Sequence, residues 1–111
     1  MKKDLPRPIS PTEGALVSRM LSAAGAPLAP PDEVTGICEC GCATIHFMED
    51  THGARVARDA IGRTPAGVEV GAILWGKDGK VASLEIYTLG TDTSELPTPD
   101  SLQFDPLAPA S

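Results

Sequence analysis

No lysine or arginine follows residue 80, so the charge of this chain is unevenly placed. Its 111 residues carry 9 basic and 15 acidic side chains, a formal net charge of -6. All nine basic groups lie in residues 1–80 with ten acids, whereas residues 81–111 carry five acids alone. A protein that binds nucleic acid by neutralising phosphates needs the opposite balance. We therefore expect no nucleic-acid partner.

Long apolar runs are also missing. The most apolar early stretch, residues 15–26, is interrupted by polar side chains and is too short to span a bilayer. An acid, an arginine and two prolines follow residues 1–3, where a signal peptide would need apolar residues. The three cysteines are an odd number within five residues, a poor basis for a secreted disulfide framework. The sequence therefore predicts no membrane association and a cytoplasmic location with reduced thiols.

Proline is nearly absent from the middle of the chain. Only Pro65 lies between residues 32 and 96, whereas six prolines precede this stretch and four follow it. Because proline lacks the N–H that a sheet ladder needs, the flanks should be extended or turned and the middle free to form strands. The length suits one core. We divide the chain into an extended arm (1–10), a single α+β domain (11–89) and an acidic, proline-containing tail (90–111).

Residues 10–13 predict the start of a helix. Ser10 can accept a hydrogen bond from a first-turn amide while Glu13 reaches back to the Ser10 amide, and Pro11 suits the first helical position. Apolar residues then recur at helical spacing until glycine and proline end the pattern. They are Leu16, Val17, Met20, Leu21 and Ala24. The prediction is a helix over 11–24.

The remainder of the domain predicts extended segments. They cover 34–48 with a break at a glycine, 55–61, 68–75 and 80–89. The segment 55–61 would suit a helix as well, but a turn signal after it favours a strand. The fold class is therefore α+β, with one N-terminal helix packed on a mostly antiparallel sheet of three to five strands.

An Asp-Gly pair predicts a tight hairpin between the last two strands and assigns their faces. A tight turn places Ile73 and Trp75 on the same side as Leu84, and we expect this apolar face to meet the helix. The opposite face would carry Val70 and Leu74 beside polar residues. We expect the C-terminal segment, or a second protomer of a homodimer, to cover it.

Three cysteines and a histidine have the spacing of a candidate metal site. In an extended segment Cys38, Cys40 and Cys42 share one side with His46, and thiolates with imidazole suit a tetrahedral Zn²⁺. Alternate residues on a flat strand lie about 6.5–7 Å apart, too far for two thiolates on one zinc, so a tight turn at Gly41 would be needed. The alternatives are a labile disulfide between Cys40 and Cys42 and plain packing of small buried side chains.

Short motifs resemble a group of small uncharacterised bacterial proteins. The motifs are a Cys-x-Cys-Gly-Cys strand from residue 38, an Asp-Gly hairpin that runs into Leu84-Glu85-Ile86, and a Leu-Pro-x-Pro close at residues 96–99. The opening Arg-Pro-Ile-Ser-Pro-x-Glu at residues 7–13 is similar too. No activity is known for the group, so the resemblance implies none and carries over no functional residues.

Two functions stay open at this point. The first is a small acidic intracellular binding or interaction domain without catalytic activity or a cofactor. Its partner would be a basic protein, or a second copy held at the outer face of the sheet, and the acidic end would be either a contact surface or a solvated tail. The second is a zinc-type metal or thiol redox module built on Cys38, Cys40, Cys42 and His46. Nothing in the spacing selects catalytic residues.

Overall fold

The computed structural model describes residues 5–24, 27–37, 43–91 and 93–104. In chain order its elements are β1 (Arg7–Pro8), α1 (Pro11–Ala24), β2 (Glu33–Val34), β3 (Gly36–Ile37), β4 (Ile45–His46), β5 (Arg55–Arg63), β6 (Glu69–Lys77), β7 (Lys80–Thr88) and the 3-10 helix η1 (Pro99–Ser101). A five-stranded sheet has the order β3-β4-β7-β6-β5, and β1 pairs with β2 in a small second sheet. Strands within both sheets pair antiparallel, so the predicted α+β class is confirmed.

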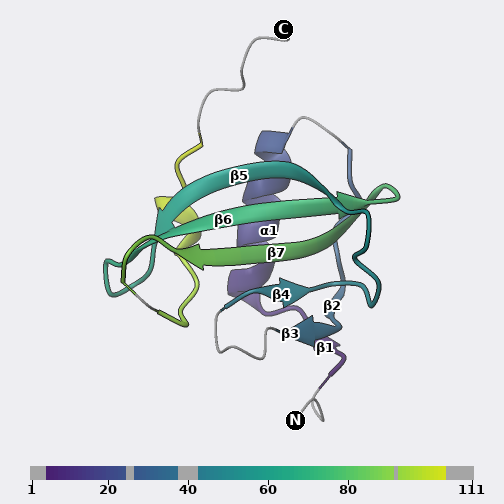
Figure 1. Ribbon diagram of the computed structural model, residues 1–111, viewed down its shortest axis with the longest axis horizontal. Coiled ribbons are helices and arrows are strands. Elements are labelled where there is room, and N and C mark those ends of the chain that lie inside the picture. The colour runs from purple at the N-terminus through teal and green to yellow at the C-terminus, as the bar shows by residue number, and fades with distance from the viewer. Residues whose placement is uncertain (1–4, 25–26, 38–42, 92, 105–111) are drawn as a thin grey trace, which may run out of the picture.

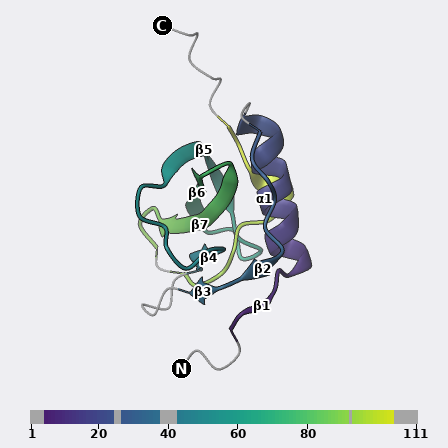
Figure 2. The ribbon, with the colours of Figure 1, turned by 90° about the vertical axis from the view of Figure 1, so that its right-hand side faces the viewer.

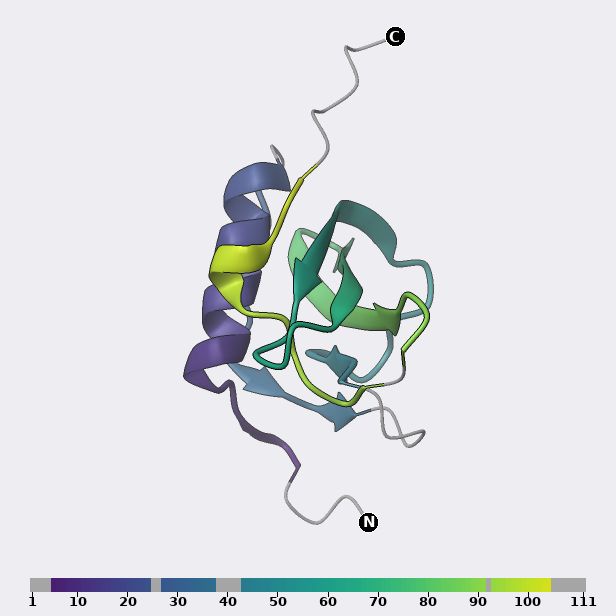
Figure 3. The ribbon, with the colours of Figure 1, turned by 90° about the vertical axis from the view of Figure 1, so that its left-hand side faces the viewer.

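The molecule has two layers. The helix α1 crosses one face of the five-stranded sheet, and the long strands β5, β6 and β7 curve over it (Figure 1). Views from the two sides show the helix on one side and the sheet on the other (Figure 2, Figure 3). The helix η1 lies beside α1 (Figure 3). Within the described ranges, no helix covers the opposite face of the sheet, which we call the outer face.

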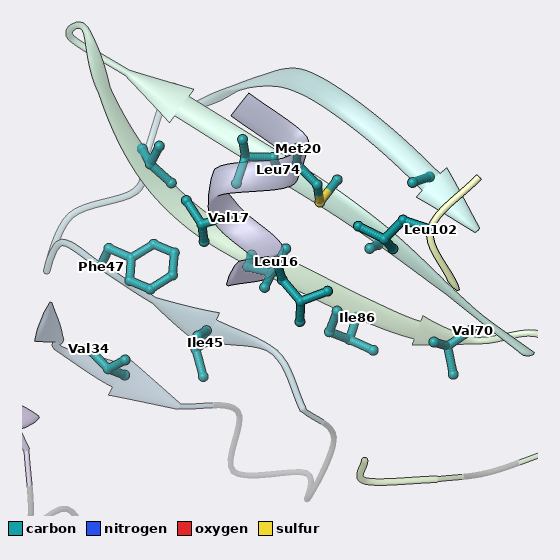
Figure 4. Packing of buried hydrophobic residues seen from close by; sticks show 14 residues of the cluster. Leu16, Val17, Met20, Val34, Ile45, Phe47, Val70, Leu74, Ile86 and Leu102 are labelled. Carbon is teal, nitrogen blue, oxygen red and sulfur yellow. The ribbon is translucent and has the colours of Figure 1, made fainter. Parts of the chain in front are cut away.

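The core lies between α1 and the inner face of the sheet (Figure 4). Leu16, Val17 and Met20 of the helix are buried, as their helical spacing predicts. The sheet and its flanks contribute Val34, Ile45, Phe47, Ala60, Val70, Ala72, Leu74, Leu84 and Ile86. Leu102, which lies beyond the domain boundary predicted at residue 89, is also part of this core.

The predicted facing of the β6–β7 hairpin is wrong. The turn at residues 78–79 has φ values of 53° and 77°, as an Asp-Gly pair predicts. Just after Trp75, however, β7 carries one residue more than β6 and the register shifts. Leu74 consequently pairs with Leu84, and Trp75 pairs with Ser83. A one-residue shift turns every later side chain to the other face.

The two faces are therefore exchanged relative to the prediction. Val70 and Leu74 are fully buried against α1 and the C-terminal segment, so no second protomer is needed to cover them. Ile73 and Trp75 are partly exposed and lie on the outer face.

The C-terminal segment also covers part of a sheet edge. Ile61 of β5 and Gln103 exchange two backbone hydrogen bonds of 3.0 and 2.7 Å. The amide of Arg63 donates to the Ser101 hydroxyl at 2.8 Å. Because an open strand edge invites pairing with another chain, this contact protects the C-terminal half of β5.

None of the described helices has the length and apolar character that a membrane span requires.

A network of hydrogen bonds connects β1 to the start of α1. The Ser10 amide donates to Glu13 at 2.9 Å and the Glu13 amide donates to the Ser10 hydroxyl at 3.1 Å, which confirms the predicted capping pair. Arg7 of β1 adds two bonds to the same carboxylate, of 2.9 and 2.7 Å. Burial by itself would raise the pKa of Glu13, but the bonds from Arg7 and Ser10 outweigh it and hold the pKa below its ordinary value.

Replacing Glu13 by alanine removes the capping bond and both bonds to Arg7. We expect the free energy of unfolding at pH 7 to fall by about 2 kcal/mol, since a lost cap and bonds to charged groups each contribute on this scale. Urea denaturation measures it. The matched control is Thr12→Ala at an exposed neighbouring position, which should cost less than about 0.5 kcal/mol.

The same carboxylate should make stability depend on pH. Because the folded-state pKa of Glu13 is lowered, its contribution is present above the pKa of the unfolded chain. The contribution is lost as the pH falls through the lowered, folded-state pKa. The stability difference between the wild type and Glu13→Gln should therefore shrink in acid. A difference that stays constant down to strongly acidic pH would contradict this assignment.

Candidate functional site

The outer face carries aromatic, acidic and hydroxyl side chains in neighbouring rows. The strand register aligns one row across four strands, which consists of His46, Ser83, Trp75 and Val56. The next row consists of Glu85, Ile73 and Asp59. Val56 is 53% exposed, so an apolar side chain lies open beside the indole.

A cleft of about 500 Å³ opens on this face. Its sheet side is lined by Thr44, His46, Trp75, Ser83 and Glu85, and residues of the loop before β5, among them Thr51, form a wall. Among the described lining residues, Glu85 is the one with a formal charge when His46 is neutral. The cleft therefore combines one carboxylate, one indole and several neutral polar groups.

Trp75 and Glu85 are held together by a hydrogen bond. The indole Nε1–H of Trp75 donates to Oε1 of Glu85 at 3.0 Å. Trp75 pairs with Ser83, two residues from Glu85, so the two side chains are diagonal neighbours on one face. The bond fixes the carboxylate beside the indole. Sequence reasoning missed this pair, because the unshifted register placed the two residues on opposite faces.

Thr44 fixes another side of the cleft. Its hydroxyl accepts a hydrogen bond from the Ile86 amide at 2.9 Å and donates to the Ile86 carbonyl at 3.1 Å. The side chain thus continues the pairing of β4 with β7 by one position. Both bonding directions of this hydroxyl are used by the protein itself.

An ion pair ties the wall of the cleft to the sheet. Lys77 of β6 donates to the Asp50 carbonyl at 3.0 Å and lies 3.5 Å from its carboxylate. The Asp50 carboxylate also accepts from the His52 amide at 3.0 Å. This bond and the charge of Lys77 hold the pKa of Asp50 below its ordinary value. The loop is thereby positioned next to Trp75 and Ser83.

His46 is the member of the predicted metal set that the structure describes. Its imidazole lies against Gly36 of β3, and its Nδ1 is buried without a hydrogen-bond partner in the described part of the chain. Cys38, Cys40 and Cys42 lie outside the described residues. The residues that the structure describes include no cluster of three or more histidine, cysteine, aspartate or glutamate side chains suited to a metal. The zinc site stays a prediction.

Tyr87 occupies the space above a glycine on the outer face. Gly71 pairs with Tyr87, and a Cβ atom added at Gly71 would overlap the tyrosine ring. An aromatic ring laid over a glycine on a neighbouring strand shields the backbone that the glycine leaves open. This contact, like the one between Trp75 and Glu85, depends on the register and was not predicted.

No protein-family model, curated protein or solved structure matches this chain. The candidate function accordingly rests on the geometry of the outer face.

Gly71→Ala should destabilise the protein by about 1–3 kcal/mol, because the added methyl group displaces the Tyr87 ring. In a Tyr87→Ala background the same substitution should cost much less, since the ring is gone. Denaturant unfolding of the four proteins gives the interaction energy between the two positions. Equal costs in both backgrounds would show that the ring does not lie over Gly71.

Proposed function

We propose that this protein is a small, non-catalytic binding domain that takes up a basic partner protein on the outer face of its five-stranded sheet. The observation that carries the proposal is the cleft in which Glu85 is held beside Trp75. Aromatic side chains on an accessible surface are typical anchors of protein interfaces.

The charge distribution favours a basic partner. Glu85 and Asp59 lie in the same row on the outer face, separated by Ile73. Lys77, farther along β6, is paired with Asp50. Residues 81–111, which include Glu85, carry five acids and no basic side chain. Complementary charge raises the rate of encounter and selects against acidic partners.

A protein partner suits the apolar part of this face. Val56 is exposed next to Trp75, and Ile73 and Tyr87 are partly exposed on the same face. A protein partner would bury these apolar side chains, and their burial would stabilise the complex. A small polar molecule would bury less apolar area and gain less. The proposal retains the cytoplasmic location and the absence of a cofactor that we expect from the sequence.

Binding should follow the charge of the partner. We expect labelled oligo-arginine to bind and labelled oligo-glutamate not to bind, as measured by fluorescence anisotropy. The affinity should fall between about 20 mM and about 300 mM salt, because screening shortens the reach of charges. Failure of every basic peptide to bind, or equal binding of the acidic one, would contradict the proposed function.

A zinc or thiol module on Cys38, Cys40, Cys42 and His46 is the second candidate. The observation in its favour is the buried Nδ1 of His46, which has no partner among the described residues. A buried polar atom without a partner costs free energy, and a metal ion is one group that would satisfy it.

Elemental analysis and thiol titration test this second candidate. It predicts stoichiometric zinc in the purified, untagged protein and loss of that zinc in Cys40→Ser. The control is Ser94→Ala, at a polar residue distant in sequence from the cysteines, which should leave the metal content unchanged. Metal-free protein whose thiols react only after denaturation would exclude both the zinc and the redox version.

A further inference from the structure

We infer that the cleft on the outer face is a guanidinium site, in which an arginine side chain of the partner stacks on Trp75 and pairs with Glu85. The inference rests on the proposed function and names the group by which the basic partner is anchored.

The carboxylate has an open position for such a ligand. Oε1 of Glu85 accepts the indole N–H at 3.0 Å, while no described residue donates a hydrogen bond to Oε2. The bond to Trp75 holds the carboxylate at the edge of the indole ring. A cation that lies over the ring is thus brought next to a negative charge.

The remaining lining groups add acceptors without adding charge. Ser83, 6% exposed, and Thr51 line the cleft, and their hydroxyls are not engaged by any described residue. The Thr44 hydroxyl is already held by Ile86, to whose carbonyl it donates and from whose amide it accepts. The cleft therefore presents a carboxylate and two hydroxyls around an aromatic face.

This set of groups selects a cation. A cation over an indole is attracted by the ring face, and more strongly where water is partly excluded. A charge-assisted bond to the carboxylate adds to this attraction. Glu85 would repel an anionic group, and a neutral group would leave the charge of the Glu85 carboxylate without a counter-charge.

The indole ring in the cleft favours guanidinium over ammonium. A guanidinium group stacks flat on an aromatic ring and spreads five donors in its plane, whereas an ammonium group is a compact, strongly hydrated point charge. The carboxylate and the two hydroxyls line the same cleft and are acceptors for such donors. About 500 Å³ is ample room for one side chain of this size.

The single tryptophan of the chain makes the site directly measurable. Because Trp75 is the one indole, its fluorescence reports the cleft alone. The probes are N-acetyl-arginine amide, N-acetyl-lysine amide, oligo-arginine and oligo-lysine. We expect the arginine probes to change Trp75 emission, and oligo-arginine to bind about tenfold or more tightly than oligo-lysine.

Glu85→Gln is the decisive variant, because it keeps the size of the side chain and removes its charge. It should weaken oligo-arginine binding by about tenfold or more. The matched control is Glu95→Gln, an exposed acid that does not line the cleft and should leave binding nearly unchanged. Circular dichroism checks that both variants fold. If Glu85→Gln does not fold, Ser83→Ala provides a second test, with a smaller expected loss.

The outcomes separate the inference from the proposed function. Oligo-arginine that binds without changing Trp75 emission, and equally well to Glu85→Gln, would overturn the guanidinium site while the basic partner stands. Lysine probes that bind as tightly as arginine probes would also overturn it. Failure of all basic peptides to bind would overturn the proposed function itself.

Discussion

One extra residue in β7, just after the hairpin turn, decides what each face of this sheet does. It shifts the register so that Leu74 lies opposite Leu84 and Trp75 opposite Ser83. Because side chains alternate along a strand, the shift turns Val70, Leu74 and Leu84 towards α1. The same shift turns Trp75 outward to the side of Glu85. Core and candidate site are thus two consequences of one β-bulge.

Contacts made by the flanks of the chain stabilise this arrangement. The carboxylate of Glu13 joins the first strand to the first turn of the helix, with Arg7 and Ser10 as its donors. At the other end, Leu102 enters the core and Gln103 pairs with β5. The sheet is therefore covered on one face and partly on one edge. In the described part of the chain, no helix lies over the outer face.

Local features of the chain were sufficient to predict much of the fold. A capping pair, a 3.6-residue apolar period and a terminating glycine predicted helix 11–24, which the structure confirms. The Asp-Gly pair predicted its hairpin turn, and the strand assignment of 55–61 is confirmed within β5. Each of these depends on residues close together in sequence. The candidate zinc set could not be followed in the same way, since three of its four members lie outside the described residues.

The facing of the strands and the make-up of the cleft were decided only by tertiary packing. An unshifted hairpin and a bulged one differ by a single residue, and the turn itself is compatible with both. The bulge is favoured because it buries Val70 and Leu74 against α1 and Leu102, contacts that bring distant segments together. The pairs Trp75–Glu85 and Tyr87–Gly71 follow from that choice. Chain-local chemistry therefore determined which elements form, whereas burial of apolar area across the whole domain determined which side chains reach the surface together.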